Sequence, residues 1–205
     1  MGAKTSETGD SGQTRRHIVQ AMGQLRLPRH AEMPDLPLYM DQLLICAERA
    51  LAPVRNPEEK PLSASMVNNY VKHGALPAAR GKRYGRDHLA RLIFICLAKR
   101  AFSIARITQM MDLVSDGPTT GTAAYDRFCA LFEARLRELA AADSVPADAG
   151  AGPAAPNATY TDEEAARIPE AEGPEPTSRD LLAITAEALA RVIYIDSFLA
   201  ATPGH

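Results

Sequence analysis

Amide and cationic side chains gather in one short stretch of the chain, residues 62–84. With 100° between successive residues, a helix over residues 63–73 has one face of hydrogen-bonding groups and one cation, without an acid. The residues of that face are Ser65, Asn68, Asn69, Lys72 and His73. Asn can form two hydrogen bonds with adenine, and Ser and Lys can reach base edges or phosphates. We therefore expect this face to enter the major groove of a nucleic acid. The alternative is a solvated polar face, which most amphipathic helices have.

A short basic loop follows the expected helix. Gly74 predicts the end of the helix, and Pro77 prevents it from resuming at once. We expect a small hairpin over residues 78–85, with Gly81 permitting the turn. Its Arg80, Lys82 and Arg83 can neutralise phosphates, whereas Tyr84 can either donate a hydrogen bond to a phosphate or pack beneath the loop. The alternative is a basic surface loop without a binding role.

The charge distribution along the chain supports an anionic partner. Residues 62–106 contain nine Lys and Arg residues and one acidic residue, Asp87. The residues before them contain eight basic and eight acidic residues, and residues 107–205 contain six basic and sixteen acidic residues. A basic centre between a neutral head and an acidic tail favours binding to nucleic acid, and the acidic tail limits indiscriminate binding.

The same stretch resembles a known family of DNA-binding proteins. Residues 62–77 look like the second helix and following turn of MerR-type winged helix-turn-helix regulators. Residues 80–89 look like their wing and the start of the next helix, and residues 101–107 resemble their next turn. Residues 27–115 together are similar to a bacterial family of domains of unknown function described as having a MerR-like domain.

This resemblance implies a DNA-binding domain with its recognition helix at residues 63–73 in the major groove. It places the groove contacts at Ser65, Asn68, Asn69, Tyr70, Lys72 and His73, and the wing contacts at Arg80, Lys82, Arg83 and Tyr84. The chain departs from the MerR pattern, which usually has Arg in place of Asn68 and an aromatic residue in place of Asn69. The wing is also shorter than in that family, and a longer proline-containing loop precedes Ser63. The helical pattern places Tyr70 on the buried arc, so we expect a core side chain with its hydroxyl at the edge.

The predicted fold class is all-α, a MerR-like winged helix-turn-helix with additional C-terminal helices and a disordered acidic linker. Hydrophobic periodicity and capping signals predict its helices. For the helix after Pro34, we expect Asp35 as the N-cap and Pro37 in the first turn. They are expected at residues 15–25, 37–51, 63–73, 86–100, 104–114, 123–142 and 178–201. The organisation predicted from them is a mostly disordered arm (1–26), the helical domain (27–142), a flexible linker rich in Ala, Pro, Gly and acid (143–178) and an amphipathic helix (179–201).

The apolar face of the last helix must be buried against something. Two arrangements remain open. Helices 123–142 and 178–201 can form a homodimer, or the last helix can fold back over its own domain, because the linker is long enough for either.

Other function classes find little support in the chain. No apolar stretch approaches the roughly 18 residues of a membrane span, and no apolar signal segment follows the N-terminus, so we expect a cytoplasmic protein. Cys46, Cys96 and Cys129 are expected to be core thiols, and His73 and His88 lack metal-ligand spacing. No catalytic or cofactor motif is present, and no cluster of residues indicates an effector pocket. We expect no enzyme, metal or cofactor, and a regulator that binds double-stranded DNA. The alternative is a protein-interaction module of helix-turn-helix shape.

Overall fold

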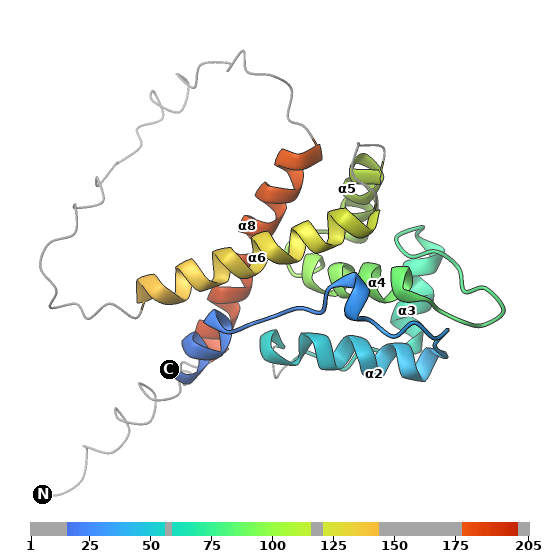
Figure 1. Ribbon diagram of the computed structural model, residues 1–205, viewed down its shortest axis with the longest axis horizontal. Coiled ribbons are helices and arrows are strands. Elements are labelled where there is room, and N and C mark those ends of the chain that lie inside the picture. Colours follow the sequence, from blue (N-terminus) through green and yellow to red (C-terminus); the bar gives the residue numbers. More distant parts are fainter. Residues whose placement is uncertain (1–15, 56–58, 116–120, 144–177, 201–205) are drawn as a thin grey trace, which may run out of the picture.

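Helices stacked on both sides of a central helix make up the architecture (Figure 1). The computed structural model describes residues 16–55, 59–115, 121–143 and 178–200. Its described elements are a helix over residues 16–23, η1 (His30–Glu32), α2 (Met40–Leu51), η2 (Ala52–Val54), α3 (Ala64–Lys72), α4 (Arg86–Ala98), α5 (Ile104–Ser115), α6 (Gly121–Asp143) and α8 (Ser178–Ala200). The all-α prediction is confirmed. Nearly all of the expected linker, and the arm before residue 16, lie outside the described residues.

Local capping explains why two of the helices start where the sequence predicts. The Oγ of Ser63 accepts a hydrogen bond from the backbone N–H of Met66, which satisfies one of the free donors in the first turn of α3. The Oγ of Ser103 accepts in the same way from the N–H of Arg106 and begins α5. Gly74 follows α3 with a φ of +74°, a left-handed conformation that costs glycine little. The helix therefore ends where glycine predicts it to end.

The prediction for the start of α2 is wrong. We expected Asp35 as the N-cap and Pro37 in the first turn, but α2 begins at Met40, with Tyr39 as its N-cap. The reason is tertiary: Leu38 is extended and exchanges two backbone hydrogen bonds with Tyr84, of 2.8 and 2.9 Å. A residue paired in this way cannot also lie in a helix. The side chain of Gln42 instead accepts from the N–H of Tyr39 at 2.9 Å and caps the later start.

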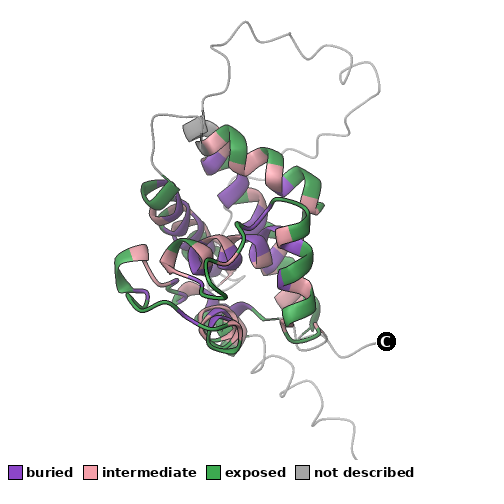
Figure 2. Ribbon diagram, turned by 90° about the vertical axis from the view of Figure 1, so that its right-hand side faces the viewer, coloured by how far each residue is buried: buried purple, intermediate pink, exposed green. Residues whose placement is uncertain are grey.

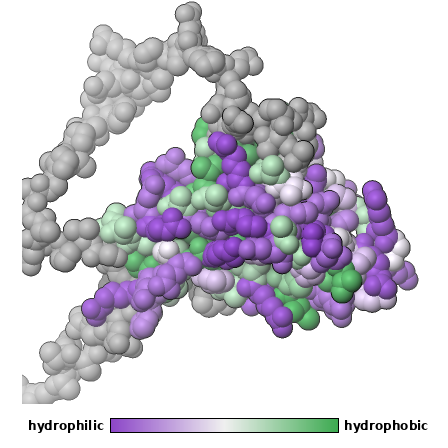
Figure 3. Space-filling view, viewed as in Figure 1, coloured by the Kyte–Doolittle hydropathy of each residue, from purple (hydrophilic) through white to green (hydrophobic). Residues whose placement is uncertain are grey.

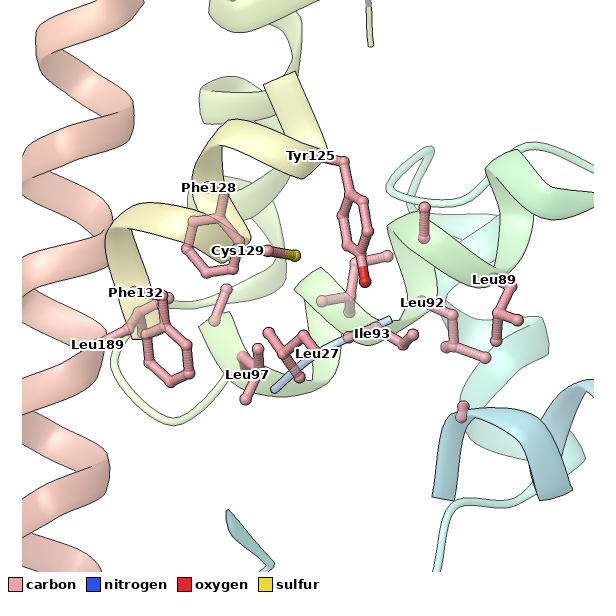
Figure 4. Close-up of a cluster of buried hydrophobic side chains, with 14 of the residues drawn as sticks. Leu27, Leu89, Leu92, Ile93, Leu97, Tyr125, Phe128, Cys129, Phe132 and Leu189 are labelled. Carbon is pink, nitrogen blue, oxygen red and sulfur yellow. The ribbon is translucent and has the colours of Figure 1, made fainter. Parts of the chain in front are cut away.

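Helix α4 forms the centre of the hydrophobic core. It is buried on most of its circumference and packs against α2, α5 and α6. Its buried residues are Leu89, Ala90, Leu92, Ile93, Ile95, Leu97 and Ala98. Figure 4 shows α6 turning Tyr125, Phe128 and Phe132 towards this helix. Phe128 meets Phe94 edge to face, with ring centroids 4.9 Å apart, and stacks on Phe132 at 5.7 Å.

The C-terminal helix packs within its own chain. α8 lies against α6 and also contacts α5. Its buried residues, Leu182, Thr185, Ala186, Leu189, Ala190 and Ile193, recur at helical spacing and form the face expected to need a partner. In Figure 2 the buried residues of the helices likewise face the interior of the bundle and the exposed ones face outwards.

A partly buried ion pair joins the segment before η1 to α6, and we call this contact the α6 junction. The guanidinium of Arg29 binds both carboxylate oxygens of Glu133, at 2.6 and 2.7 Å. Glu133 is 7% exposed and also accepts from the N–H of Leu27 at 2.8 Å. The hydroxyl of Tyr125 donates to the carbonyl of Pro28 at 3.0 Å. The bond to Glu133, strengthened by its charge, raises the pKa of Arg29 above its ordinary value.

Candidate nucleic-acid interface

The polar face predicted for α3 is exposed to solvent. Ser65, Asn68, Asn69, Lys72 and His73 are all exposed, whereas Val67 and Tyr70 on the opposite side are buried. We call these five exposed residues the α3 face. His73 serves as the C-cap of the helix, and its Nδ1 donates to the carbonyl of Asn69 at 2.8 Å. The other residues of the α3 face make no side-chain hydrogen bond or ion pair within the described part of the chain, so their donors and acceptors are available.

The basic loop forms the hairpin that the sequence predicts. Arg80 and Arg83 exchange two backbone hydrogen bonds, of 3.0 and 3.1 Å, around the two-residue turn Gly81–Lys82. Both turn residues have positive φ, 57° for Gly81 and 62° for Lys82, the combination found in a type I′ turn. The pairing of Leu38 with Tyr84 ties the base of this hairpin to the segment before α2. The hairpin is therefore a fixed feature of the fold.

The hairpin and α3 lie at the same end of the molecule. Figure 1 shows α3 and the loop between α3 and α4 at the end remote from α8. In Figure 3, in the same orientation, most of the surface visible at this end is hydrophilic. Two further contacts hold the end of α3: the N–H of Leu76 donates to the carbonyl of Tyr70 at 3.2 Å, and the hydroxyl of Thr108 lies 3.5 Å from the carbonyl of His73.

Arg83 is positioned by an aromatic residue that the sequence analysis did not single out. Its guanidinium carbon lies 3.6 Å from the centroid of the Tyr39 ring, a cation–π contact. The same guanidinium donates to the hydroxyl of Tyr39 and to the carbonyl of Pro37. These contacts occupy part of the donor set of Arg83 and hold it beside the turn. The sequence placed Tyr39 inside the helix predicted over residues 37–51, as one of the residues along a single stripe, which does not indicate a binding role.

Two of the predicted contact residues, Tyr70 and Tyr84, are buried. Tyr70 is 3% exposed, and its hydroxyl is buried without a hydrogen-bond partner, so burial raises its pKa. Tyr84 is 6% exposed and packs edge to face on His88, with ring centroids 5.4 Å apart. This burial fits the alternatives that the sequence left open, a core side chain for Tyr70 and a Tyr84 packed beneath the loop, and it disfavours a direct contact of either with nucleic acid.

Several cations of the basic segment are neutralised by acids from outside it. Lys99 and Arg100 form ion pairs with Glu59 at 3.7 and 3.2 Å, and Arg86 pairs with Asp35 at 3.3 Å. By contrast, the side chains of Lys72, Arg80 and Lys82 are exposed and have no acidic partner among the residues that the structure describes. Arg91 on α4 and Arg106 on α5 also lack an acidic partner among these residues, so α3 and the hairpin hold part of the free positive charge of the segment.

The other candidate groups are structural. His88 accepts from the N–H of Gly85 through Nδ1 at 3.1 Å and so caps α4. Cys129 is fully buried, and burial raises the pKa of its thiol to about 12, which makes a thiolate sensor unfavourable there. Within the described ranges, no group of three or more His, Cys, Asp and Glu residues could hold a metal ion. None of the helices in those ranges is long and apolar enough to cross a membrane.

Comparison with known proteins finds a family match over most of the described residues. Residues 28–128 match the model of a family described as a domain of unknown function, DUF1836. This range contains α2 to α5, the hairpin and the first part of α6, and so includes the whole candidate interface. No curated protein matches the chain, and no solved structure does.

Proposed function

We propose that this protein is a regulator of transcription that binds double-stranded DNA through a MerR-like winged helix-turn-helix. In this arrangement α3 lies in the major groove, and the hairpin, as a short wing, contacts the neighbouring backbone. The observation that carries the proposal is the presence, at one end of the molecule, of an exposed amide-rich face on α3 and a hairpin whose Arg80 and Lys82 have no acidic partner among the described residues. Amides can bind base edges and unpaired cations can bind phosphates, so α3 would read the base sequence and the hairpin would bind the backbone.

The conformation of Lys82 gives further support. A φ of +62° costs a residue with a side chain about 1 kcal/mol or more, and glycine or asparagine is the usual occupant of such a position. Lys82 is exposed and lies in the two-residue turn of the hairpin, so the turn presents a flexible cation to solvent. Backbone strain of this kind is typical of functional positions, and a phosphate contact by Lys82 is the role that we propose for it.

The test is a selection of genomic DNA fragments by the purified protein. We expect recovery of a defined sequence, and Asn68→Ala should relax discrimination at one base pair by about 1–3 kcal/mol. Gln20→Ala is a matched control, because Gln20 is an exposed amide on the helix at residues 16–23, outside the proposed interface. Failure to recover any fragment at low salt would contradict the proposal, and so would equal effects of the two substitutions.

The alternative is a protein-interaction module of helix-turn-helix shape. Two exposed apolar residues favour this alternative, because they could contact a protein. Leu36, just before α2, is 75% exposed, and Ile45, on α2, is 51% exposed. A stable protein partner in a pull-down, together with no retardation of duplex DNA, would support this alternative.

A homodimer stays part of the proposal, with a smaller contact surface than the sequence predicted. The α6 and α8 helices use much of their apolar surface on each other, which leaves Ile184, Ile195 and Leu199 exposed on α8 at 61%, 55% and 63%. A second copy of α8 would cover these residues and present two α3 faces to a symmetric DNA site. Sedimentation of a monomer at high micromolar concentration would contradict the dimer while leaving DNA binding intact.

A further inference from the structure

A cavity of about 300 Å³ lies between α4, α5, α6 and α8, and His30 of η1 and Pro77 of the loop between α3 and the hairpin also line it. Its volume corresponds to about ten water molecules and is at the lower end of the range for small-molecule sites. Most of its wall is apolar and comes from all four helices. Representative wall residues are Phe94, Met111, Val114, Phe128 and Leu182.

The polar groups of the cavity are few, and one of them is an unpaired cation. Arg91 of α4 lines the cavity and is partly buried, and its guanidinium makes no hydrogen bond or ion pair among the described residues. Most other partly buried arginines of the fold have acids: Arg29 binds Glu133, and Arg100 binds Glu59. An arginine that is partly withdrawn from water without a partner is a candidate for binding an anion.

A second polar group is also unused. Thr185 of α8 lines the cavity and is 3% exposed, and its hydroxyl makes no hydrogen bond within the described ranges. The lining acid, Asp87, already has a partner, because its Oδ1 lies 2.7 Å from Nε2 of His30. Thr122 of α6 also lines the cavity, so the available groups are a cation and two hydroxyls, a set that suits a carboxylate better than an ammonium group.

We propose that this cavity binds a small amphipathic carboxylate, with its apolar body among the helices and its carboxylate on Arg91. The body fits an aromatic ring, because Phe94 and Phe128 meet edge to face in the wall and methionine and leucine side chains complete it. The planar fork of Arg91 can bind both carboxylate oxygens, and Thr185 can donate a further hydrogen bond. This site does not depend on the proposed DNA binding.

Three probes with the same body and different head groups test the proposal by calorimetry on the full chain. They are 3-phenylpropanoate, 3-phenylpropanamide and 3-phenylpropylamine. We expect the carboxylate to bind at least about tenfold more tightly than the amide, because a charge-assisted pair is stronger than a neutral hydrogen bond. Arg91→Met, which keeps most of the side-chain volume, should remove this preference and leave binding of the amide within about twofold.

Arg106→Met is the matched control, because Arg106 is an exposed arginine on α5 that does not line the cavity. It should leave the preference for the carboxylate unchanged. If Arg91→Met does not fold, Arg91→Gln replaces it, with the same expected loss of preference. The proposal would be overturned if the three probes bound equally or the amine bound most tightly. It would also be overturned if the preference for the carboxylate survived substitution of Arg91, or if no probe bound at about 10 mM.

Discussion

The α6 junction and the hairpin use their cations in opposite ways. Arg29 at the junction binds both oxygens of a carboxylate that is 7% exposed, whereas Arg80 and Lys82 of the hairpin lie in solvent without an acidic partner among the described residues. The first arrangement fixes a segment of chain on the core, and the second leaves charge available to another molecule. The comparison teaches that the acids brought close by the fold decide which cations of a basic sequence are free to bind.

The largest effect should come from removing the acid of the α6 junction. Glu133→Ala leaves Arg29 without its carboxylate and the N–H of Leu27 without its acceptor, so we expect a loss of about 3–5 kcal/mol in the free energy of unfolding. Urea denaturation followed by circular dichroism measures it.

Glu138→Ala is the control on the same helix, because Glu138 is 64% exposed and its pair with Arg135 lies at the surface. We expect it to change stability by less than about 1 kcal/mol. If Glu133→Ala lowered the free energy of unfolding as little as this control, the ion pair would not hold the segment on α6. The contrast between the α6 junction and the hairpin would then be wrong.

A smaller effect, with opposite signs in two measurements, is expected at the tip of the hairpin. Lys82→Gly relieves a positive φ and should raise the free energy of unfolding by about 0.5–1 kcal/mol. The same substitution removes one phosphate contact and should weaken DNA binding. Thermal unfolding and a gel shift measure the two changes.

Gly81→Ala is the companion variant. A Cβ on Gly81 would meet no atom within 4 Å, so its cost comes from the positive φ alone, and we expect a loss of about 1 kcal/mol. If Lys82→Gly destabilised the protein, the lysine would be a structural residue of the turn, and the strain argument would be wrong.

An effect of similar size concerns Arg83, which contacts a side chain of its own chain and is also exposed on the hairpin. A double-mutant cycle of Tyr39→Leu and Arg83→Met should give a coupling energy of about 0.5–1 kcal/mol for the exposed cation–π contact. A coupling energy of zero in denaturant unfolding would mean that Tyr39 does not hold Arg83. The guanidinium of Arg83 would then be as available for binding as the side chains of Arg80 and Lys82.

Much of the fold could be predicted from the sequence, because local signals determine it. Apolar periodicity places α3 to α6 and α8, Ser63 and Ser103 cap their helices, and Gly74 ends α3. The hairpin was predictable from Gly81 within a short basic loop. The exposure of the α3 face also follows from helical spacing, which puts amides and apolar residues on opposite sides.

The remaining features depend on contacts between residues distant in sequence. Helix α2 starts at Met40, later than predicted, because Leu38 pairs with Tyr84, 46 residues away. No local sequence pattern predicts this pairing. The loss of free charge at Lys99 and Arg100 depends on Glu59, which lies outside the basic segment. The cavity requires four helices to meet around Arg91, so a sequence search for clustered polar residues could not find it.

The salt dependence of DNA binding tests the central claim most directly. Lys72, Arg80 and Lys82, with Arg83, allow about four phosphate contacts per chain, which predicts a slope of log K against log salt of about −3 to −4. Arg80→Ala combined with Lys82→Ala should reduce the size of this slope by about two units. The same charge change at Arg127 and Arg137, two exposed arginines of α6, should leave it unaltered. A slope unaffected by the hairpin substitutions, or lowered equally by both pairs, would contradict the account.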